Sequence, residues 1–179
     1  MNKVIILDRD GVINRDSMNY IKSPDEFELL PGSAQAIARL NAAGYRIGVA
    51  TNQSGVSRGL YDVAMLNAIH EKMLTLVQQV GGCIEIIEYC THLPDRDCSC
   101  RKPKPGMLIA IAKYFKCSLI NVPFVGDRVS DIQAALLVDA KPVMVLSQMT
   151  DRLGFADYPD VPVFDSLANY VDKLLISNE

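Results

Sequence analysis

Short apolar runs alternate along the chain with longer segments in which apolar residues recur at helical spacing. Because strands buried on both faces read as short apolar runs, five strands are predicted, at residues 4–7, 45–50, 84–89, 122–125 and 143–146. Helices are predicted between and after them, at 33–43, 62–80, 105–115, 130–138 and 166–175. This alternation predicts an α/β fold, with a Rossmann-like three-layer α/β/α arrangement around a central parallel sheet.

The connection from residue 14 to residue 30 shows neither pattern, and we expect it to form a flap over the ends of the strands. No linker divides the chain, and 179 residues suit one compact domain. Residues 1–179 are therefore expected to form a single domain that has no large cap domain. Asp62 is expected to cap the longest helix, which Gly81 and Gly82 end.

The overall charge narrows the possible partners. The formal net charge is −3 and no run of lysine or arginine stands out, which argues against nucleic acid. The N-terminus lacks the pattern of a signal peptide, and no apolar stretch reaches the roughly 20 residues that span a membrane. We therefore expect a cytoplasmic protein that binds neither nucleic acid nor membrane and is a monomer.

Polar residues follow the predicted strands where each one ends. Asp8 and Asp10 follow the first strand, Thr51 and the amides after it follow the second, and Asp127 follows the fourth. In a parallel sheet these ends lie at one edge, where ligands bind. Carboxylates that converge there repel one another unless a hard cation such as Mg²⁺ compensates for them.

A second cluster follows the third strand. Three thiols and an imidazole within eleven residues can form a closed tetrahedral zinc site, which predicts a structural zinc-binding loop at 90–100 with the ligands Cys90, His92, Cys98 and Cys100. The alternative is a loop with incidental cysteines. Cys83 and Cys117 lie outside the cluster and are expected to be small buried apolar residues, and His70 is expected on the surface of its helix.

Four motifs in order carry a resemblance: DRDG after the first strand, TNQSG after the second, the lysine of RKPKPG, and GDRVSD. Together they resemble the haloacid dehalogenase superfamily over nearly the whole chain. The resemblance implies a phosphate-ester hydrolase in which Asp8 attacks phosphorus and Asp10 is the general acid and base. It also implies that Thr51 and Lys102 hold the phosphoryl group, and that Mg²⁺ is bound by Asp8, by the Asp10 carbonyl and by Asp127.

The role of Asp131 in GDRVSD stays open. It could bind the metal directly, bond the N-terminus of the following helix, or position Lys102. Arg101 precedes that lysine and could hold a second phosphate, since an arginine can bind phosphate through two parallel hydrogen bonds. The alternative for Arg101 is a surface ion pair.

The zinc loop narrows the resemblance to two sister groups of small phosphatases within the superfamily. One acts on a heptose bisphosphate of lipopolysaccharide core synthesis, and TNQSGVSRG and KPKPGM favour it. The other acts on histidinol phosphate, and the shortness of the loop favours it. The first group implies attack at the 7-phosphate and these substrate-binding residues: Asp16, Ser17, Met18, Asn19, Asn52, Gln53, Ser54, Arg101 and Arg128.

Two further readings compete with a hydrolase. A mutase or phosphotransferase of the same superfamily would need a cap domain that excludes water, for which the chain has no room. A binding protein that is stabilised by zinc and has no catalytic activity would have no chemical need for both Asp8 and Asp10. The sequence therefore favours a Mg²⁺-dependent phosphatase of a phosphorylated sugar.

Overall fold

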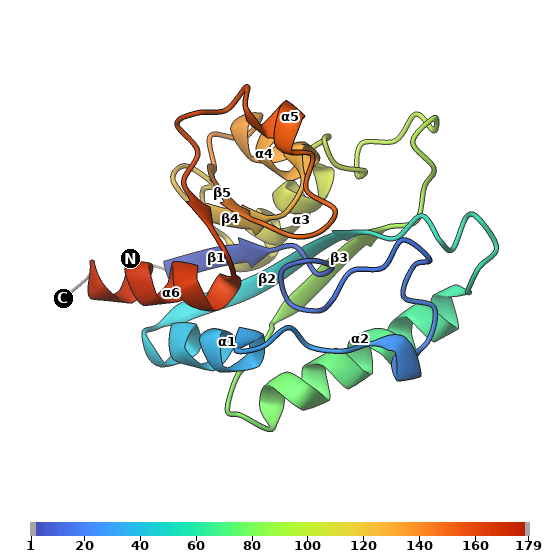
Figure 1. The fold of residues 1–179 in the computed structure, drawn as a ribbon, viewed down its shortest axis with the longest axis horizontal. Coiled ribbons are helices and arrows are strands. Elements are labelled where there is room, and N and C mark those ends of the chain that lie inside the picture. The colour runs from blue at the N-terminus through green and yellow to red at the C-terminus, as the bar shows by residue number, and fades with distance from the viewer. Residues whose placement is uncertain (1–2, 178–179) are drawn as a thin grey trace.

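The computed structural model describes residues 3–177, which fold around one parallel sheet (Figure 1). The sheet has six strands in the order β3-β2-β1-β4-β5-β6, and every neighbouring pair is parallel. The strands are β1 (Lys3–Leu7), β2 (Tyr45–Asn52), β3 (Ile86–Cys90), β4 (Pro123–Gly126), β5 (Lys141–Val145) and β6 (Val163–Phe164).

Five helices connect successive strands on the two sides of this sheet, and a sixth follows the last strand. They are α1 (Ser33–Ala42), α2 (Val63–Gln78), α3 (Gly106–Phe115), α4 (Val129–Leu136), α5 (Arg152–Phe155) and α6 (Leu167–Ile176). A 3₁₀ helix, η1 (Pro24–Glu26), lies in the long connection after β1. The cap of α2 forms as predicted, because the Asp62 side chain accepts a hydrogen bond from the Met65 backbone N–H.

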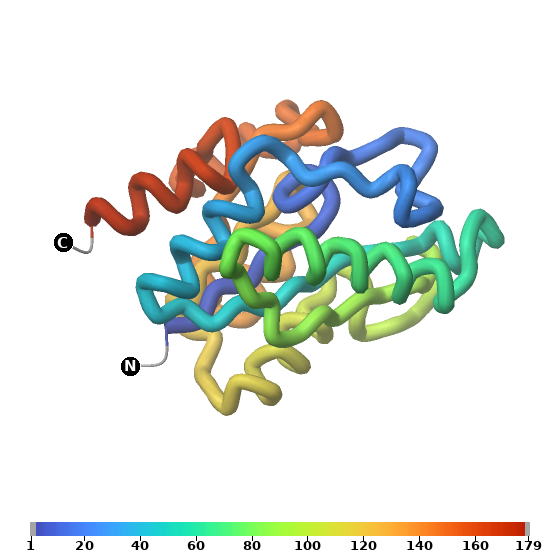
Figure 2. Tube along the Cα trace, turned by 90° about the horizontal axis from the view of Figure 1, so that it is seen from below, coloured from blue at the N-terminus to red at the C-terminus, as the bar shows by residue number. Residues whose placement is uncertain are grey.

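Two hydrophobic cores lie on the two faces of the sheet. Along β1, Ile5 and Leu7 pack into the core that α1, α2 and α6 cover, whereas Val4 and Ile6 pack into the core under α3 and α4. This alternation follows from the two-residue period of a strand. Figures 1 and 2 show α1, α2 and α6 on one side of the sheet, with α3 and α4 on the other. The predicted three-layer fold is therefore confirmed.

The direction of strand addition reverses next to β1. The first half of the chain adds β2 and β3 on one side of β1, and the second half adds β4, β5 and β6 on the other. In open α/β sheets the crevice at such a switch point, beyond the carboxyl ends of the strands, is where ligands bind. The residues that follow β1, β2 and β4 therefore come together at one place.

The five predicted strands and five predicted helices all form, with ends that differ by a few residues. The sequence pattern missed β6 and α5, because an element of two or four residues is too short to display a period. The connection 14–30 is largely irregular, as expected, and is anchored by β-bridges of Asn14 with Asp10 and with Leu29.

Three side chains lie elsewhere than the sequence predicted. His70 is buried, so the expectation of a surface residue is wrong. It lies four residues after Leu66 and three before Met73, in the apolar stripe of α2, so helical spacing could have revealed its burial. Cys83 is exposed, and Cys117 is only partly buried against the core under α3 and α4, since both lie in connections between elements.

Within residues 3–177, no helix combines the length and the apolar character that a membrane-spanning helix needs.

Replacement of Gly48 is expected to destabilise the fold. Gly48 lies in β2, and a Cβ atom there would come within 2.8 Å of Ile111 and 3.3 Å of Phe115, both in α3. We expect Gly48→Val to lower the free energy of unfolding by about 1–3 kcal/mol, the usual range for overpacking, and Gly48→Ala to lower it less. Urea unfolding measures both values, and an unchanged stability in Gly48→Val would contradict this packing.

Candidate active site

Asp8 occupies the switch point directly after β1. Its backbone N–H donates to the Val125 carbonyl at 2.8 Å, which continues the pairing of β1 with β4. The side chain is buried, and its Oδ1 accepts from the Arg9 backbone N–H at 2.8 Å. Gly11 completes the turn with a φ of 83°, and a Cβ atom there would overlap the Asp127 carboxylate.

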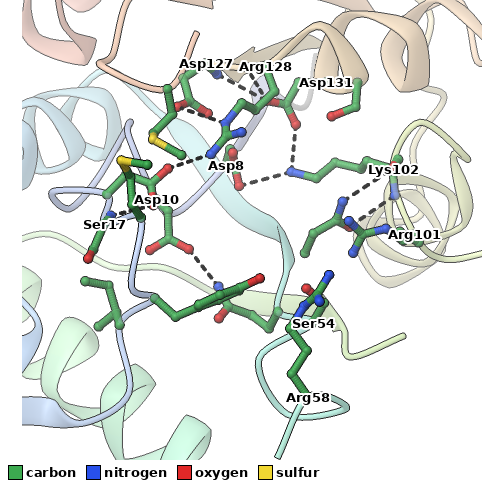
Figure 3. A pocket seen from close by; sticks show the side chains of 18 residues that line it. Asp8, Asp10, Ser17, Ser54, Arg58, Arg101, Lys102, Asp127, Arg128 and Asp131 are labelled. Atoms are coloured by element: carbon green, nitrogen blue, oxygen red, sulfur yellow. Dashed lines mark hydrogen bonds and ion pairs between the residues drawn. The ribbon is translucent and has the colours of Figure 1, made fainter. Parts of the chain in front are cut away.

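Lys102 lies in the connection between β3 and α3, and its side chain is also buried. Its ammonium lies 3.0 Å from Oδ1 of Asp8 and 2.7 Å from Oδ1 of Asp131, and it donates to the Ala50 carbonyl at 2.8 Å. Burial alone would lower the pKa of this lysine, but Asp131 and Asp8 outweigh it and raise the pKa. Lys102 is therefore a fixed positive charge against Asp8 (Figure 3).

Asp131 connects Lys102 to the start of α4. Its Oδ2 accepts hydrogen bonds from the backbone N–H groups of Asp127 and Arg128 at 3.1 and 3.0 Å. Gly126 leaves room for this, since a Cβ atom there would overlap the Asp131 carboxylate. The sequence left three roles open for Asp131. The structure shows two of them, the hydrogen bonds to the N-terminus of α4 and the ion pair with Lys102.

The carboxylates fit a divalent cation. Carboxylate oxygens of Asp8, Asp127 and Asp131 lie within 4.8 Å of one another. Ser147 donates to Oδ2 of Asp127 at 2.6 Å, but among residues 3–177 the buried Oδ1 of Asp127 has no hydrogen-bond partner. Burial and the neighbouring acids raise the pKa of Asp127 to about 7 and that of Asp8 well above its usual range. A hard cation such as Mg²⁺ would satisfy the free oxygen and offset this repulsion.

Asp10 is held separately from that cluster. Its carboxylate accepts hydrogen bonds from the side chains of Arg9, Asn14 and Gln53. Burial alone would raise its pKa, but Arg9 and these hydrogen bonds lower it. Arg9 and Asn14 were not singled out from the sequence, because the pattern around them does not distinguish a buried turn from an exposed one.

The end of β2 contributes amides and a hydroxyl. Thr51 is buried, and its Oγ1 accepts from the Gln53 side chain at 2.9 Å. Asn52 forms a reciprocal pair with the backbone of Lys102: its side chain donates to the carbonyl and accepts from the N–H, both at 3.1 Å. This pair fixes the lysine's main chain against β2.

A cavity of about 300 Å³ opens over these groups (Figure 3). Besides Asp8, Asp10, Lys102 and Asp127, it is lined by eight of the nine residues predicted to bind substrate: Asp16, Ser17, Met18, Asn52, Gln53, Ser54, Arg101 and Arg128. Asn19 and Thr51 are not among the lining residues. The cavity also has lining residues that no prediction named as substrate contacts: Tyr20, Ile21, Arg58, Ser130, Asp131 and Met149.

Three arginines face this cavity with different partners. Arg128 pairs with Asp16 at 2.8 Å, which ties the flap 14–30 to the start of α4. Arg101 donates to the His92 carbonyl at 3.1 Å and has no carboxylate partner within the described part of the chain. The guanidinium of Arg58 lies 5.9 Å from the ring centre of Tyr20. Arg101 is therefore available to bind an anion.

The cysteine and histidine cluster forms as the spacing predicted. Sγ of Cys90 lies 2.9 Å from Sγ of Cys100 and 4.0 Å from that of Cys98, and Nδ1 of His92 lies 3.4 and 3.3 Å from the sulfurs of Cys90 and Cys100. Zinc–sulfur bonds of about 2.3 Å place tetrahedral ligands about 3.8 Å apart. Three thiols and an imidazole whose ligand atoms all lie within 4.8 Å of one another are compatible with a structural zinc ion, which would move them slightly apart. The loop leads directly into Arg101 and Lys102.

The strand order, the paired aspartates after β1 and the buried lysine from the connection after β3 are those of a phosphatase of the haloacid dehalogenase superfamily. A solved had-like phosphatase of Mesorhizobium loti shares this fold with a TM-score of 0.80 at 29% identity, over 98% of this chain and 85% of that one. Within that superfamily the chain belongs to the family of D-glycero-beta-D-manno-heptose-1,7-bisphosphate 7-phosphatases. The family predicted from the four motifs and the zinc loop is thereby confirmed.

The comparisons cover nearly the whole chain. The heptose bisphosphatase of Pseudomonas putida is 48% identical over 174 residues, which cover 97% of this chain and 99% of that protein. That of Helicobacter pylori J99 is 34% identical, over 82% and 84% of the two chains. The crystal structure of the Bordetella bronchiseptica enzyme with magnesium and phosphate has a TM-score of 0.91 at 47% identity, over 98% and 99%. A family model for polynucleotide kinase 3 phosphatase matches residues 3–152.

Loss of one thiol is expected to release zinc and loosen the loop. We expect Cys98→Ser to lower the zinc content of the purified protein, and a loss of about 2 kcal/mol would lower Tm by about 4–8 °C. Metal analysis and thermal unfolding measure both quantities. Cys83→Ser, which changes an exposed thiol outside the cluster, is the control and should match the wild type. Full zinc content and an unchanged Tm in Cys98→Ser would contradict the zinc site.

Proposed function

We propose that this protein is a Mg²⁺-dependent phosphatase that removes the 7-phosphate of D-glycero-D-manno-heptose 1,7-bisphosphate through an aspartyl-phosphate on Asp8. The observation that carries the chemistry is the pairing of buried Asp8 with the buried ammonium of Lys102 at 3.0 Å, at the base of the cavity. A carboxylate held against a fixed cation can attack a phosphoryl group while the lysine offsets the charge on its oxygens.

Asp8 and Asp10 divide the reaction between them. A carboxylate oxygen of Asp8 forms a bond to phosphorus, the bond from phosphorus to the 7-oxygen breaks, and Asp10 donates a proton to that oxygen. In the second half, Asp10 takes a proton from water as the water attacks phosphorus, and the bond to Asp8 breaks. Phosphate leaves and both aspartates return to their starting states.

Other groups hold the transferred phosphoryl. Lys102 lies against Asp8, and Thr51 lies at the end of the neighbouring strand β2. Asp8, the backbone carbonyl of Asp10 and Asp127 would hold Mg²⁺, which supplies positive charge for the phosphoryl oxygens and orients them for attack. Ser147 keeps the Asp127 carboxylate in place by its 2.6 Å hydrogen bond.

The second phosphate of the substrate has a candidate partner in Arg101. Its guanidinium lines the cavity and has no carboxylate partner in the described residues, whereas Arg128 is already paired with Asp16. We therefore propose that Arg101 binds the 1-phosphate, together with Ser54, which lines the same cavity. The flap residues Asp16, Ser17 and Met18 would contact the sugar.

The relatives support the heptose substrate over histidinol phosphate. Proteins that match nearly the full length of this chain are named for the heptose 1,7-bisphosphate, in its β anomer. Such an enzyme acts in the ADP-heptose branch of lipopolysaccharide core synthesis. We propose that it acts in the cytoplasm, where a small phosphorylated sugar would be found, and that it is a monomer, because a single chain supplies every residue that lines the cavity.

Phosphate release from two substrates tests the function directly. With Mg²⁺, we expect kcat/KM for heptose 1,7-bisphosphate to exceed that for histidinol phosphate at least about tenfold, with one phosphate released per molecule. Asp8→Asn serves as the blank and should show only background release, since an amide cannot attack phosphorus as a carboxylate does. Preference for histidinol phosphate would assign the protein to the sister group, and full activity in Asp8→Asn would reject the nucleophile.

Arg101 is expected to govern affinity for the bisphosphate. We expect Arg101→Gln to raise KM for heptose 1,7-bisphosphate about 10–100-fold, the effect of a charge-assisted hydrogen bond, with a smaller change in kcat. Steady-state kinetics measure this, and KM for 4-nitrophenyl phosphate, which has one phosphate, should stay near the wild-type value. Arg96→Gln, an exposed arginine of the same loop, is the control. An unchanged KM for the bisphosphate in Arg101→Gln would remove Arg101 from the second phosphate site.

A further inference from the structure

Arg9 is fully buried and lies, in the sequence, between the two proposed catalytic aspartates, Asp8 and Asp10. Its Nε and Nη2 donate to Oδ1 of Asp10 at 3.2 and 2.9 Å. A buried guanidinium requires partners for its donors, because an unpaired charge in the interior is costly. Asp10 meets that requirement on one side of the group only.

His70 meets it on the other side. Its Nε2 lies 3.1 Å from Nη1 of Arg9, and since arginine can only donate, Nε2 must be the acceptor. The ring is therefore neutral and carries its proton on Nδ1. Burial and the nearby charge of Arg9 lower the pKa of His70 to about 3, so the ring stays neutral at any pH at which the enzyme would work. His70 is not among the residues that line the cavity.

The two oxygens of Asp10 have different surroundings. Oδ1 accepts twice from Arg9 and once from Asn14 at 2.9 Å, so its lone pairs are fully used. Oδ2 accepts a single hydrogen bond, from Gln53 at 2.9 Å, and Gln53 is itself held by Tyr61 at 2.6 Å. A proton carried by Asp10 therefore belongs on Oδ2, and only that oxygen can serve a ligand in the cavity.

We propose that His70 is a positioning residue for Asp10 that acts through Arg9: by accepting from Nη1 it fixes the guanidinium that holds Oδ1, and so keeps Oδ2 turned toward the leaving oxygen. This proposal rests on the proposed function, since it assigns Asp10 the proton transfer. The contact between His70 and Arg9 links α2 to the turn after β1, although the two residues are 61 positions apart in the sequence.

The role predicts a dependence on the leaving group. A general acid matters for an alkyl ester, whose leaving oxygen needs a proton, and much less for 4-nitrophenyl phosphate, whose leaving group is stable as an anion. His70→Leu removes the acceptor, and His70→Gln keeps an oxygen that can accept from Arg9. The two variants therefore separate the hydrogen bond from the mere presence of a side chain.

In steady-state assays, we expect His70→Leu to lower kcat/KM for heptose 1,7-bisphosphate about 10–100-fold, as for a misplaced acid. This ratio reports the transfer of the phosphoryl group to Asp8 and not the later attack of water, in which Asp10 is the base. The kcat/KM for 4-nitrophenyl phosphate should stay within about threefold of the wild-type value, and His70→Gln should restore most of the loss on the bisphosphate. The ratio of the two rates does not depend on the folded fraction, since both rates scale with it. Met73→Ala, a buried change in the same helix without a polar contact, is the control: it lowers Tm and leaves the ratio unchanged.

Equal losses on both esters, no loss at all, or a His70→Gln variant as slow as His70→Leu would each overturn the proposal. The proposed function fails in a different way. A wild-type chain that hydrolyses 4-nitrophenyl phosphate and leaves heptose 1,7-bisphosphate intact contradicts that function alone. The comparison of variants is then made with fructose 1,6-bisphosphate as the alkyl ester.

Discussion

The structure depends on how charge is balanced at the switch point of its sheet. Among the described residues, five charged side chains are buried: Asp8, Asp127, Asp131, Arg9 and Lys102. Three carboxylates against two cations, with Asp10 close by, leave an excess of negative charge in a region of low dielectric. The raised pKa of Asp127 and its unpartnered Oδ1 are signs of that excess. The need for a bound cation is therefore a property of the folded chain itself.

The charges in this balance come from three different parts of the chain. Asp8 follows β1, Asp127 follows β4, and Lys102 leaves the zinc-binding loop after β3. The lysine has no strand of its own to hold it. Its backbone is fixed instead by the reciprocal bonds with Asn52 and by a loop whose thiols and imidazole converge on one point. The zinc site therefore helps to hold Lys102 in its position in the catalytic cleft.

Much of the arrangement was predictable because it follows local rules. Apolar runs located the sheet, and strand ends located Asp8 and Asp127. The pairing of Lys102 with Asp8 came from resemblance to a family, since no spacing brings residues 94 positions apart together. The burial of Arg9 could not be predicted, because it depends on a distant histidine. Asn19, which was predicted to contact substrate, does not line the cavity; the path of an irregular flap has no sequence period that would locate it.

The zinc-binding loop has a consequence for how this family can change. Cys90 and His92 are attached to β3, and Cys100 leads into the Lys102 backbone that Asn52 holds. Both ends of the loop are therefore anchored independently of residues 94–97, which form an exposed turn. Insertions, deletions and substitutions in that turn can therefore change which substrates the cleft admits during evolution. The buried charged residues beneath the turn keep their positions.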